Sequence, residues 1–473
     1  MWKGLQFGWF GGGLLLASLA LAQAPEGVQA SWTLEDAIEQ ALTRNRDLVR
    51  GALDLQSYRL AEEEARESTR GILIVPEGTG QASSDYSEAR MGLRVEKTAS
   101  YGTRVGVVAA VRQIEVDGIP TQRRGEVRVE VSQPLFRQFG PLMQNEPIVS
   151  ANENWMAARR AWERERSSLV VRVVELFEGL INLRHQIDSD EAFAARMEKM
   201  WLLADAREQQ GKSTRTEVMR MDLQRGKAAA RLEVERAQLG ILYQEFANLL
   251  GLPLDTAFQL VPPPLLNLDV EDSDRALSVA LKERPDYAQA LQDIATGERH
   301  LKQARRSLLP DLRLVGRQTT YGEGEEWSDA GRFDEDDWFV GLAADMNMNL
   351  RGAHLEVARS DVDVEARRQT AEIVRYRLAV EVNSALSVYY RTRAELELAT
   401  RNRELASNRA ELSRALFEAG RATADSVSDA ESDTVKAQLQ ELKARQDASV
   451  SAYRLLDTLG TLVPTPRELL WNE

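Results

Sequence analysis

The sequence contains no cysteine, and aromatic residues make up only 6% of its 473 positions. Without cysteine, a disulfide framework, a thiolate metal site and a cysteine nucleophile are all excluded. The three histidines, His185, His300 and His354, are far apart in the sequence, so we expect no histidine metal cluster. No nucleophile elbow, phosphate-binding loop or dinucleotide fingerprint is present. We therefore expect neither an enzyme nor a bound metal or cofactor.

Long hydrophobic runs are absent beyond the N-terminal segment. A membrane-spanning helix needs about 18 to 20 apolar residues in a row, so any membrane insertion must use strands. The N-terminus has Lys3, an apolar run over 11–21 and the small-x-small sequence Ala20-Leu21-Ala22. This pattern predicts a secretory signal peptide over 1–22, with cleavage after Ala24 as a second choice. An uncleaved anchor is the alternative, but the run is short for one.

Basic residues are fewer than acidic ones. The chain has 60 lysines and arginines against 74 aspartates and glutamates, a net charge of -14. A phosphate backbone would be repelled by such a chain as a whole, so nucleic acid is excluded as a partner. The mean hydropathy of -0.39 and the 28% of charged residues favour long amphipathic helices.

The chain is internally duplicated. Ala41, Leu42 and Asp47 recur at one constant offset as Ala280, Leu281 and Asp286. Such a long period indicates a duplicated block and not a solenoid of short repeats. The first block is longer between Arg66 and Gly140, where an extra loop or hairpin would lie. The expected organisation is a first repeat over 23–260, a linker over 261–272, a second repeat over 273–463 and a tail over 464–473.

Each repeat is predicted to end in two long helices. Apolar residues at Leu169, Val173, Leu176, Leu180 and Leu183 are spaced by four and three, which is typical of a coiled-coil seam. The expected helices cover about 146–210 and 214–250 in the first repeat, and about 353–419 and 424–459 in the second. Helices of this length must pack side by side over most of their extent, as hairpins or as a wall of hairpins.

The middle of each repeat has a period of two. Val127, Val129 and Val131 alternate with polar residues, which predicts a hairpin over about 101–133, and the second repeat has one over about 311–348. Pro76 is expected to mark the change from helix to strand, and Gly78 to Gly80 to form a turn. Four strands cannot close a membrane barrel, so several chains would have to share one. A soluble antiparallel sheet remains the alternative.

The chain resembles the TolC-type outer membrane efflux proteins over essentially its whole mature length. The order and spacing of five segments carry the resemblance, namely TLEDAIEQAL, RALSVALKERPDYAQA, VSQPLFRQFG, QGKSTRTEV and AGRATADSV. The resemblance implies a homotrimer, with four strands per chain forming one twelve-stranded β-barrel in outer membrane lipid. A periplasmic tunnel of helices would continue it. It also implies a periplasmic adaptor and an inner membrane pump as partners.

The family likeness also directs attention to acidic residues beside the two periplasmic turns. In the family, acids after the second turn line the closed end of the channel and favour cations. The matching residue here is Asp429, with Asp425 as a substitute because Ser426 occupies a place that is often acidic. Glu217 and Asp222 hold comparable places in the first repeat. The alternative is that these acids only complement the dipole of a helix N-terminus.

Four further residues at the turns are candidates for the adaptor interface. They are Gly211, Ser213, Gly420 and Thr423. Their structural role is to end one helix and cap the next. The function implied is a passive exit duct of a tripartite efflux pump or a type I secretion system. A soluble periplasmic helical scaffold or adaptor is the alternative, and a porin is disfavoured because it needs many more strands.

Overall fold

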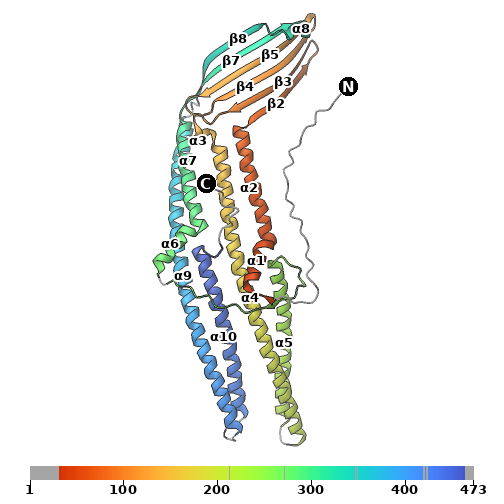
Figure 1. Cartoon of the computed structure of the whole chain (residues 1–473), viewed down its shortest axis with the longest axis vertical. Helices are drawn as coiled ribbons and strands as arrows, with labels where there is room; N and C mark the ends of the chain where they lie inside the picture. Colours follow the sequence, from red (N-terminus) through yellow and green to blue (C-terminus); the bar gives the residue numbers. More distant parts are fainter. Residues whose placement is uncertain are drawn as a thin grey trace.

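The computed structural model is an elongated molecule with a twisted sheet at one end and long helices over the rest (Figure 1). It describes residues 31–463, apart from 212–213, 271, 347, 349, 419–420 and 422–423. The predicted signal peptide over 1–22 and the tail over 464–473 lie outside the described residues. In the described part, no helix combines the length and apolar character needed to cross a membrane.

Each repeat starts near the middle of the molecule with a pair of helices that leads toward the sheet. In the first repeat these are α1 (Leu34–Arg44) and α2 (Arg46–Arg70), and in the second α6 (Ser273–Glu283) and α7 (Pro285–Ser307). Thr33 and Asp36 form the capping box of α1. The buried Asn45 divides α1 from α2, because its side chain accepts hydrogen bonds from the start of α2 and donates one to the Leu249 carbonyl. The short strands β1 (Ser31–Trp32) and β6 (Gln259–Leu260) pair beside them.

The sheet has six antiparallel strands in the order β2-β3-β4-β5-β7-β8. The first repeat supplies four of them and the second two. Their bounds are β2 (Ile72–Ala82), β3 (Tyr86–Thr98), β4 (Arg104–Val116), β5 (Ile119–Pro134), β7 (Asp311–Gly324) and β8 (Glu335–Asp345).

The predicted number of four strands per chain is therefore wrong, because the sheet of this chain has six. The hairpin of β2 and β3 occupies the extra length of the first repeat. Pro76 and the Gly78 to Gly80 segment lie inside β2, and not at a helix end or in a turn. In the single chain β2 pairs on one side only, which is the position in a sheet where proline is tolerated.

The long helices occupy the places that the apolar seams indicate. They are α4 (Glu146–Gln209) and α5 (Arg215–Leu249) in the first repeat, and α9 (Leu350–Glu418) and α10 (Ala424–Leu459) in the second. The expected spans were 146–210, 214–250, 353–419 and 424–459. Two short helices, α3 (Pro141–Gln144) and α8 (Trp327–Ala330), accompany the sheet ends.

Helices from both repeats form one layer beneath the sheet. α2 packs on α4, α4 on α7, and α7 on α9, whereas farther from the sheet α5 packs on α4 and α10 on both α9 and α4. The largest apolar core lies around the middle of α4 and includes the fully buried Phe177, Leu180 and Phe246. A smaller cluster around Tyr389 and Leu455 holds the corresponding place in the second repeat.

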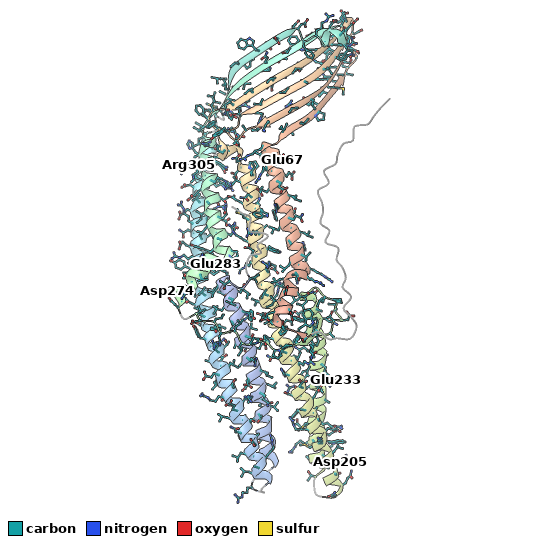
Figure 2. The ribbon with its side chains drawn as sticks, in the orientation of Figure 1. Glu67, Asp205, Glu233, Asp274, Glu283 and Arg305 are labelled. Atoms are coloured by element: carbon teal, nitrogen blue, oxygen red, sulfur yellow. The ribbon has the colours of Figure 1, made fainter. Side chains whose placement is uncertain are left out.

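A charged network joins the repeats between the core and the sheet. Arg299 of α7 donates hydrogen bonds to Glu146 and Glu153 of α4, at 2.9 Å between Nε and Glu146 Oε2 and 2.7 Å between Nη2 and Glu153 Oε2. Its guanidinium is mostly buried. Arg305, which is labelled in Figure 2, marks the end of the same helix that lies nearest the sheet. Bidentate pairing of this kind fixes the register of α7 against α4.

Candidate channel wall and helix tips

The sheet has one apolar face, which no other part of the described chain covers. Strand pairing brings alternate residues onto this face, for example Val107 opposite Val129. Fourteen large apolar side chains on this face are solvent-exposed in the single chain, and the exposed fraction of Val340 is 63%. They are Ile72, Ile74, Met91, Leu93, Val105, Val107, Val111, Val127, Val129, Val131, Leu314, Trp338, Val340 and Leu342. A face this large and apolar requires a nonaqueous neighbour.

The opposite face of the sheet is charged. Glu126 of β5 forms ion pairs with Arg90 of β3 and Arg128 of its own strand, each at 3.0 Å. Arg112 meets Glu88 at 2.6 Å across β3 and β4. Alternation of an apolar and a charged face along strands of 11 to 16 residues is the pattern of a membrane strand with one side on lipid and the other on water.

The two long helical hairpins end together at the other extreme of the molecule (Figure 1). At the first turn, Gly211 has a positive φ of 70°, and its N–H donates to the Glu208 carbonyl at 2.8 Å. This left-handed residue ends α4, as its sequence position predicts. Arg215 at the start of α5 pairs with Glu208 at 3.7 Å. Ser213, Gly420 and Thr423 lie outside the described residues.

The four candidate gate acids fall into two groups by their distance from a helix start. Glu217 and Asp425 are in the first turn of α5 and α10, where an acid complements the helix dipole. Their side chains are outside the described part of the structure. Asp222 and Asp429 lie more than a turn farther along, are exposed and gain little from the dipole. The dipole explanation therefore fits the first pair and not the second.

Asp222 is engaged within its own chain. Its carboxylate pairs with Arg225 at 2.8 Å, and Arg225 also approaches Glu198 at 3.5 Å and lies over the Trp201 ring at 4.1 Å. The guanidinium is thus held between α4 and α5. A similar cross-link joins the second hairpin, where Arg409 of α9 donates to Asp433 of α10 at 2.9 Å. Both hairpins are clamped by charge pairs close to their tips.

A buried acidic pair, which the sequence analysis missed, lies between α4 and α5. Asp190 is 5% exposed and Glu235 7%, and both share Arg231, at 3.0 Å from Asp190 Oδ2 and 3.0 Å from Glu235 Oε1. Gln186 also donates to Glu235 at 2.6 Å. Asp190 occupies the seam position between Ile187 and Ala194, so the sequence signal was an acid where the heptad pattern calls for an apolar residue.

One arginine cannot neutralise two buried carboxylates. Burial, followed by the hydrogen bond and the negative charge of Glu235, raises the pKa of Asp190 from 3.8 to about 6. The folded state therefore holds this proton more tightly than the unfolded chain, and the stability it contributes is present at low pH and lost as the pH rises through about 6.

We expect Asp190→Asn to remove this pH dependence. In the native protein, the hydrogen-exchange protection of the central α5 amides, corrected for the pH dependence of intrinsic exchange, should fall between pH 4 and pH 6.5. Above pH 6.5 it should level off. In the variant it should stay flat, because the remaining Glu235 has Arg231 to itself. The same decline in both proteins would show that another group titrates. Asp188→Asn, which changes a neighbouring acid on α4, is the matched control.

Two of the three histidines lie at separate places in the fold. His185 lines a groove between α4 and α10, with a volume of about 440 Å³, beside Asp188, Gln438 and Glu441. His300 lies 3.4 Å from Glu146 at the edge of the Arg299 network. Among the residues that the structure describes, no group of three or more histidines, aspartates and glutamates is arranged to hold a metal ion.

Several outer membrane channels are among the solved structures that this chain resembles. The chain superposes on the outer-membrane channel OprN with a TM-score of 0.69, 17% identity and 90% coverage of both chains. It superposes on the open-state MtrE outer membrane channel of Neisseria gonorrhoeae with a TM-score of 0.68 and 15% identity, covering 91% of this chain and 89% of that one. For the CmeC outer membrane channel of Campylobacter jejuni, the TM-score is 0.67 at 12% identity, with 91% and 86% covered. The fold is that of an outer membrane channel protein.

Sequence comparison agrees with this class. The family model for outer membrane efflux proteins matches residues 276–461. The outer membrane efflux protein BepC of Brucella suis biovar 1 (strain 1330) is 22% identical over 407 residues, which cover 84% of this chain and 82% of that protein. The second part of the chain thus matches the family of outer membrane efflux proteins, and most of the chain is similar to one named outer membrane efflux protein.

Proposed function

We propose that three copies of the chain form a passive exit duct across the outer membrane and the periplasm. The observation that carries this proposal is the exposed apolar face of the sheet, set at the far end of helices α4 and α9, which have 64 and 69 residues. At 1.5 Å per residue, helices of this length extend for roughly 100 Å. An outer membrane sheet on such a stalk reaches deep into the periplasm.

The exposed apolar face also separates this proposal from a soluble periplasmic scaffold. A soluble protein would place water on the apolar residues of six strands, at a cost of roughly 25 cal/mol for each Å² of apolar surface. Lipid removes that cost. The protein should therefore fractionate with outer membranes, require detergent for extraction and conduct ions in a planar bilayer. A monomer that stays in aqueous buffer without conductance would exclude the duct.

The proposed duct is exported across the inner membrane and works with two partner proteins. The signal peptide over 1–22 directs the chain out of the cytoplasm, and residues 23–260 and 273–463 are the two copies of the duplicated block. A periplasmic adaptor contacts the helix tips around Gly211, Ser213, Gly420 and Thr423, and an inner membrane pump supplies energy and substrate recognition. No catalytic step is assigned to the chain. The pump belongs to a tripartite efflux system or a type I secretion system.

Asp429 is the preferred gate residue, and its neutralisation is expected to reduce cation selectivity. Three Asp429 carboxylates near the tip would raise the local cation concentration, because a charge acts over a screening length of about 8 to 10 Å. In Asp429→Asn, the ratio of cation to anion permeability should fall severalfold in a planar bilayer. An unchanged ratio would remove Asp429 from the gate.

Asp447→Asn is the matched control for this measurement. It makes the same change of charge on the same helix, at an exposed residue. Asp447 is roughly 27 Å farther from the tip along α10, beyond the reach of a screened charge at physiological salt. Its selectivity should match that of the unmodified protein. Equal loss in both variants would mean that total charge, and not the tip, sets the selectivity.

A further inference from the structure

The two outer strands of the sheet have matching properties. In the described chain, β2 pairs only with β3 and β8 only with β7, so each has one free edge. Both strands are 11 residues long. Because all neighbouring strands are antiparallel and their number is even, β2 and β8 run in opposite directions. A β8 edge can therefore continue into the β2 edge of another copy in the same antiparallel pattern, in which Pro76 accepts through its carbonyl but donates no bond.

The additional hairpin of β2 and β3 is an integral part of the wall. β3 pairs with β4 without interruption from Tyr86 opposite Val116 to Thr98 opposite Arg104. On the charged face, Arg90 reaches across β4 to Glu126 of β5 at 3.0 Å, passing over the small Ala110. The backbone hydrogen bonds to β3 occupy this edge of β4, so β4 has no unpaired edge for a strand of another chain.

The hairpin also continues both faces of the sheet. Ile74 of β2 lies opposite Val95 of β3 on the apolar face, and on the other face Arg94 pairs with Glu77 at 2.7 Å. If the hairpin lay outside the wall, neither of its faces would meet lipid, and its apolar and charged faces would not need to continue those of the other four strands. The two faces run unbroken from β2 to β8.

The circumference of the helical layer also suits a wider wall. Four helices of each chain, α2, α4, α7 and α9, lie beneath the sheet. Twelve helices from three chains, about 8 to 10 Å apart, form a ring of roughly 95 to 120 Å. Eighteen strands about 4.8 Å apart and tilted by about 40° give a circumference of about 110 Å, whereas twelve give only about 75 Å.

We propose that β8 of each chain pairs with β2 of the next, so that three copies close one wall of eighteen strands. This inference rests on the trimeric duct proposed above and specifies its seam. A head-to-tail contact of this type closes into a ring when the rotation matches, and it leaves no free sheet edge. The resulting barrel is wider than a twelve-stranded one in proportion to its strand number, and the barrel places no narrowing above the helical tunnel.

Cysteine cross-linking tests the seam directly, since the chain contains no cysteine of its own. Val340→Cys on β8 is combined in turn with Pro76→Cys, Gly78→Cys or Gly80→Cys on the same face of β2, because a strand tilt of about 40° places this part of β2 beside the middle of β8 in the next copy. A disulfide requires Cα atoms about 4.4 to 6.8 Å apart, so only the pair that matches the seam register should link. After mild oxidation of outer membranes, most of that variant should migrate at three times the mass of one chain, and reductant should return it to the monomer.

Two further variants make each outcome decisive. Val107→Cys with Val129→Cys, opposite each other in β4 and β5, must link within one chain and shows that oxidation works. Val340→Cys with Val107→Cys links different chains only if β8 pairs with β4, in which case the wall has twelve strands. That result would overturn the eighteen-stranded seam but leave the trimeric duct intact. If neither seam links while the internal control does, the shared wall itself is wrong.

A second pair guards against local disturbance of the apolar face. Phe339→Cys on β8 is combined with Thr79→Cys on β2, both on the charged face of the sheet. The seam predicts intermolecular links on this face as well as on the other, at neighbouring positions. Links on neither face, in a protein that still extracts as a trimer, would exclude the pairing of β8 with β2.

Discussion

Replacing Val340 with arginine is expected to prevent stable insertion of the protein into the outer membrane. Val340 lies at the middle of β8 on the exposed apolar face. An arginine on the lipid face of a barrel costs about 2 to 4 kcal/mol near the bilayer midplane, and a trimer carries three. The amount of folded protein recovered from outer membranes should fall by at least tenfold, measured by detergent extraction and heat-modifiable migration.

Val315→Arg is the matched control for this change. Val315 of β7 lies opposite Gly341 of β8, one residue from Val340 in depth, but on the charged face of the sheet. An arginine there faces water beside Arg317 and Glu130, so insertion should stay near the native level. Equal loss in the two variants would mean that both faces are buried against protein, which contradicts the assignment of one face to lipid.

Truncation of Phe246 is expected to be the most destabilising single change in the helical part. Its side chain is fully buried in the central core, with ring centroids 6.0 Å from Phe177 and 5.0 Å from Phe258, both edge to face. Phe246→Ala removes the ring and leaves a cavity, which costs about 3 to 5 kcal/mol. Urea unfolding followed by far-UV circular dichroism should show the midpoint at a clearly lower urea concentration.

A comparison with Phe246→Leu separates loss of packing from disturbance of the helix. Leucine is a better helix former than phenylalanine and refills most of the volume of the ring. Phe246→Leu should therefore lose only a minor fraction of the stability that Phe246→Ala loses. Equal losses for the two would indicate that the aromatic contacts, and not the volume, hold α4, α5 and the segment at Phe258 together. No loss for alanine would remove this core from the account of stability.

The helices were predictable because their signal is local and repeated many times. Leu169, Val173 and Leu176 belong to a seam that runs through most of α4, and Gly211 ends the helix with a backbone conformation that other residues avoid. The turns and caps follow the same local rules. The division of α1 from α2 was less visible, because Asn45 breaks the helix through a bond to the distant Leu249.

The hairpin of β2 and β3 was not predicted as a strand pair, because the apolar period of β2 is irregular. In β2, Pro76, Gly78 and Gly80 interrupt the apolar alternation after Ile74, and these residues usually signal a turn. Pairing with β3 overrides that local preference. The sequence did indicate extra length at this place, but length alone does not distinguish a loop from a strand pair.

The candidate gate was only partly predictable for a different reason. A sequence places Asp222 and Asp429 beside the turns, yet it does not tell that Asp222 would be paired with Arg225. The buried Asp190 was visible as a gap in the seam, but its partners Arg231 and Glu235 come from the returning helix. Ion pairs between helices depend on the register of the hairpin, which no local rule supplies.

The connectivity of the sheet has a consequence for the order in which it forms. Strands β2 to β5 follow one another along the chain and are joined by short turns, so their pairing closes only small loops. The pairing of β5 with β7 is different, since the Arg124 and Glu323 that meet across it are 199 positions apart. Contacts of such separation form slowly, because closing a long loop costs entropy before any bond is gained. The four strands β2 to β5 should therefore pair first. The hairpin of β7 and β8 should join them only after the helices between β5 and β7 have folded.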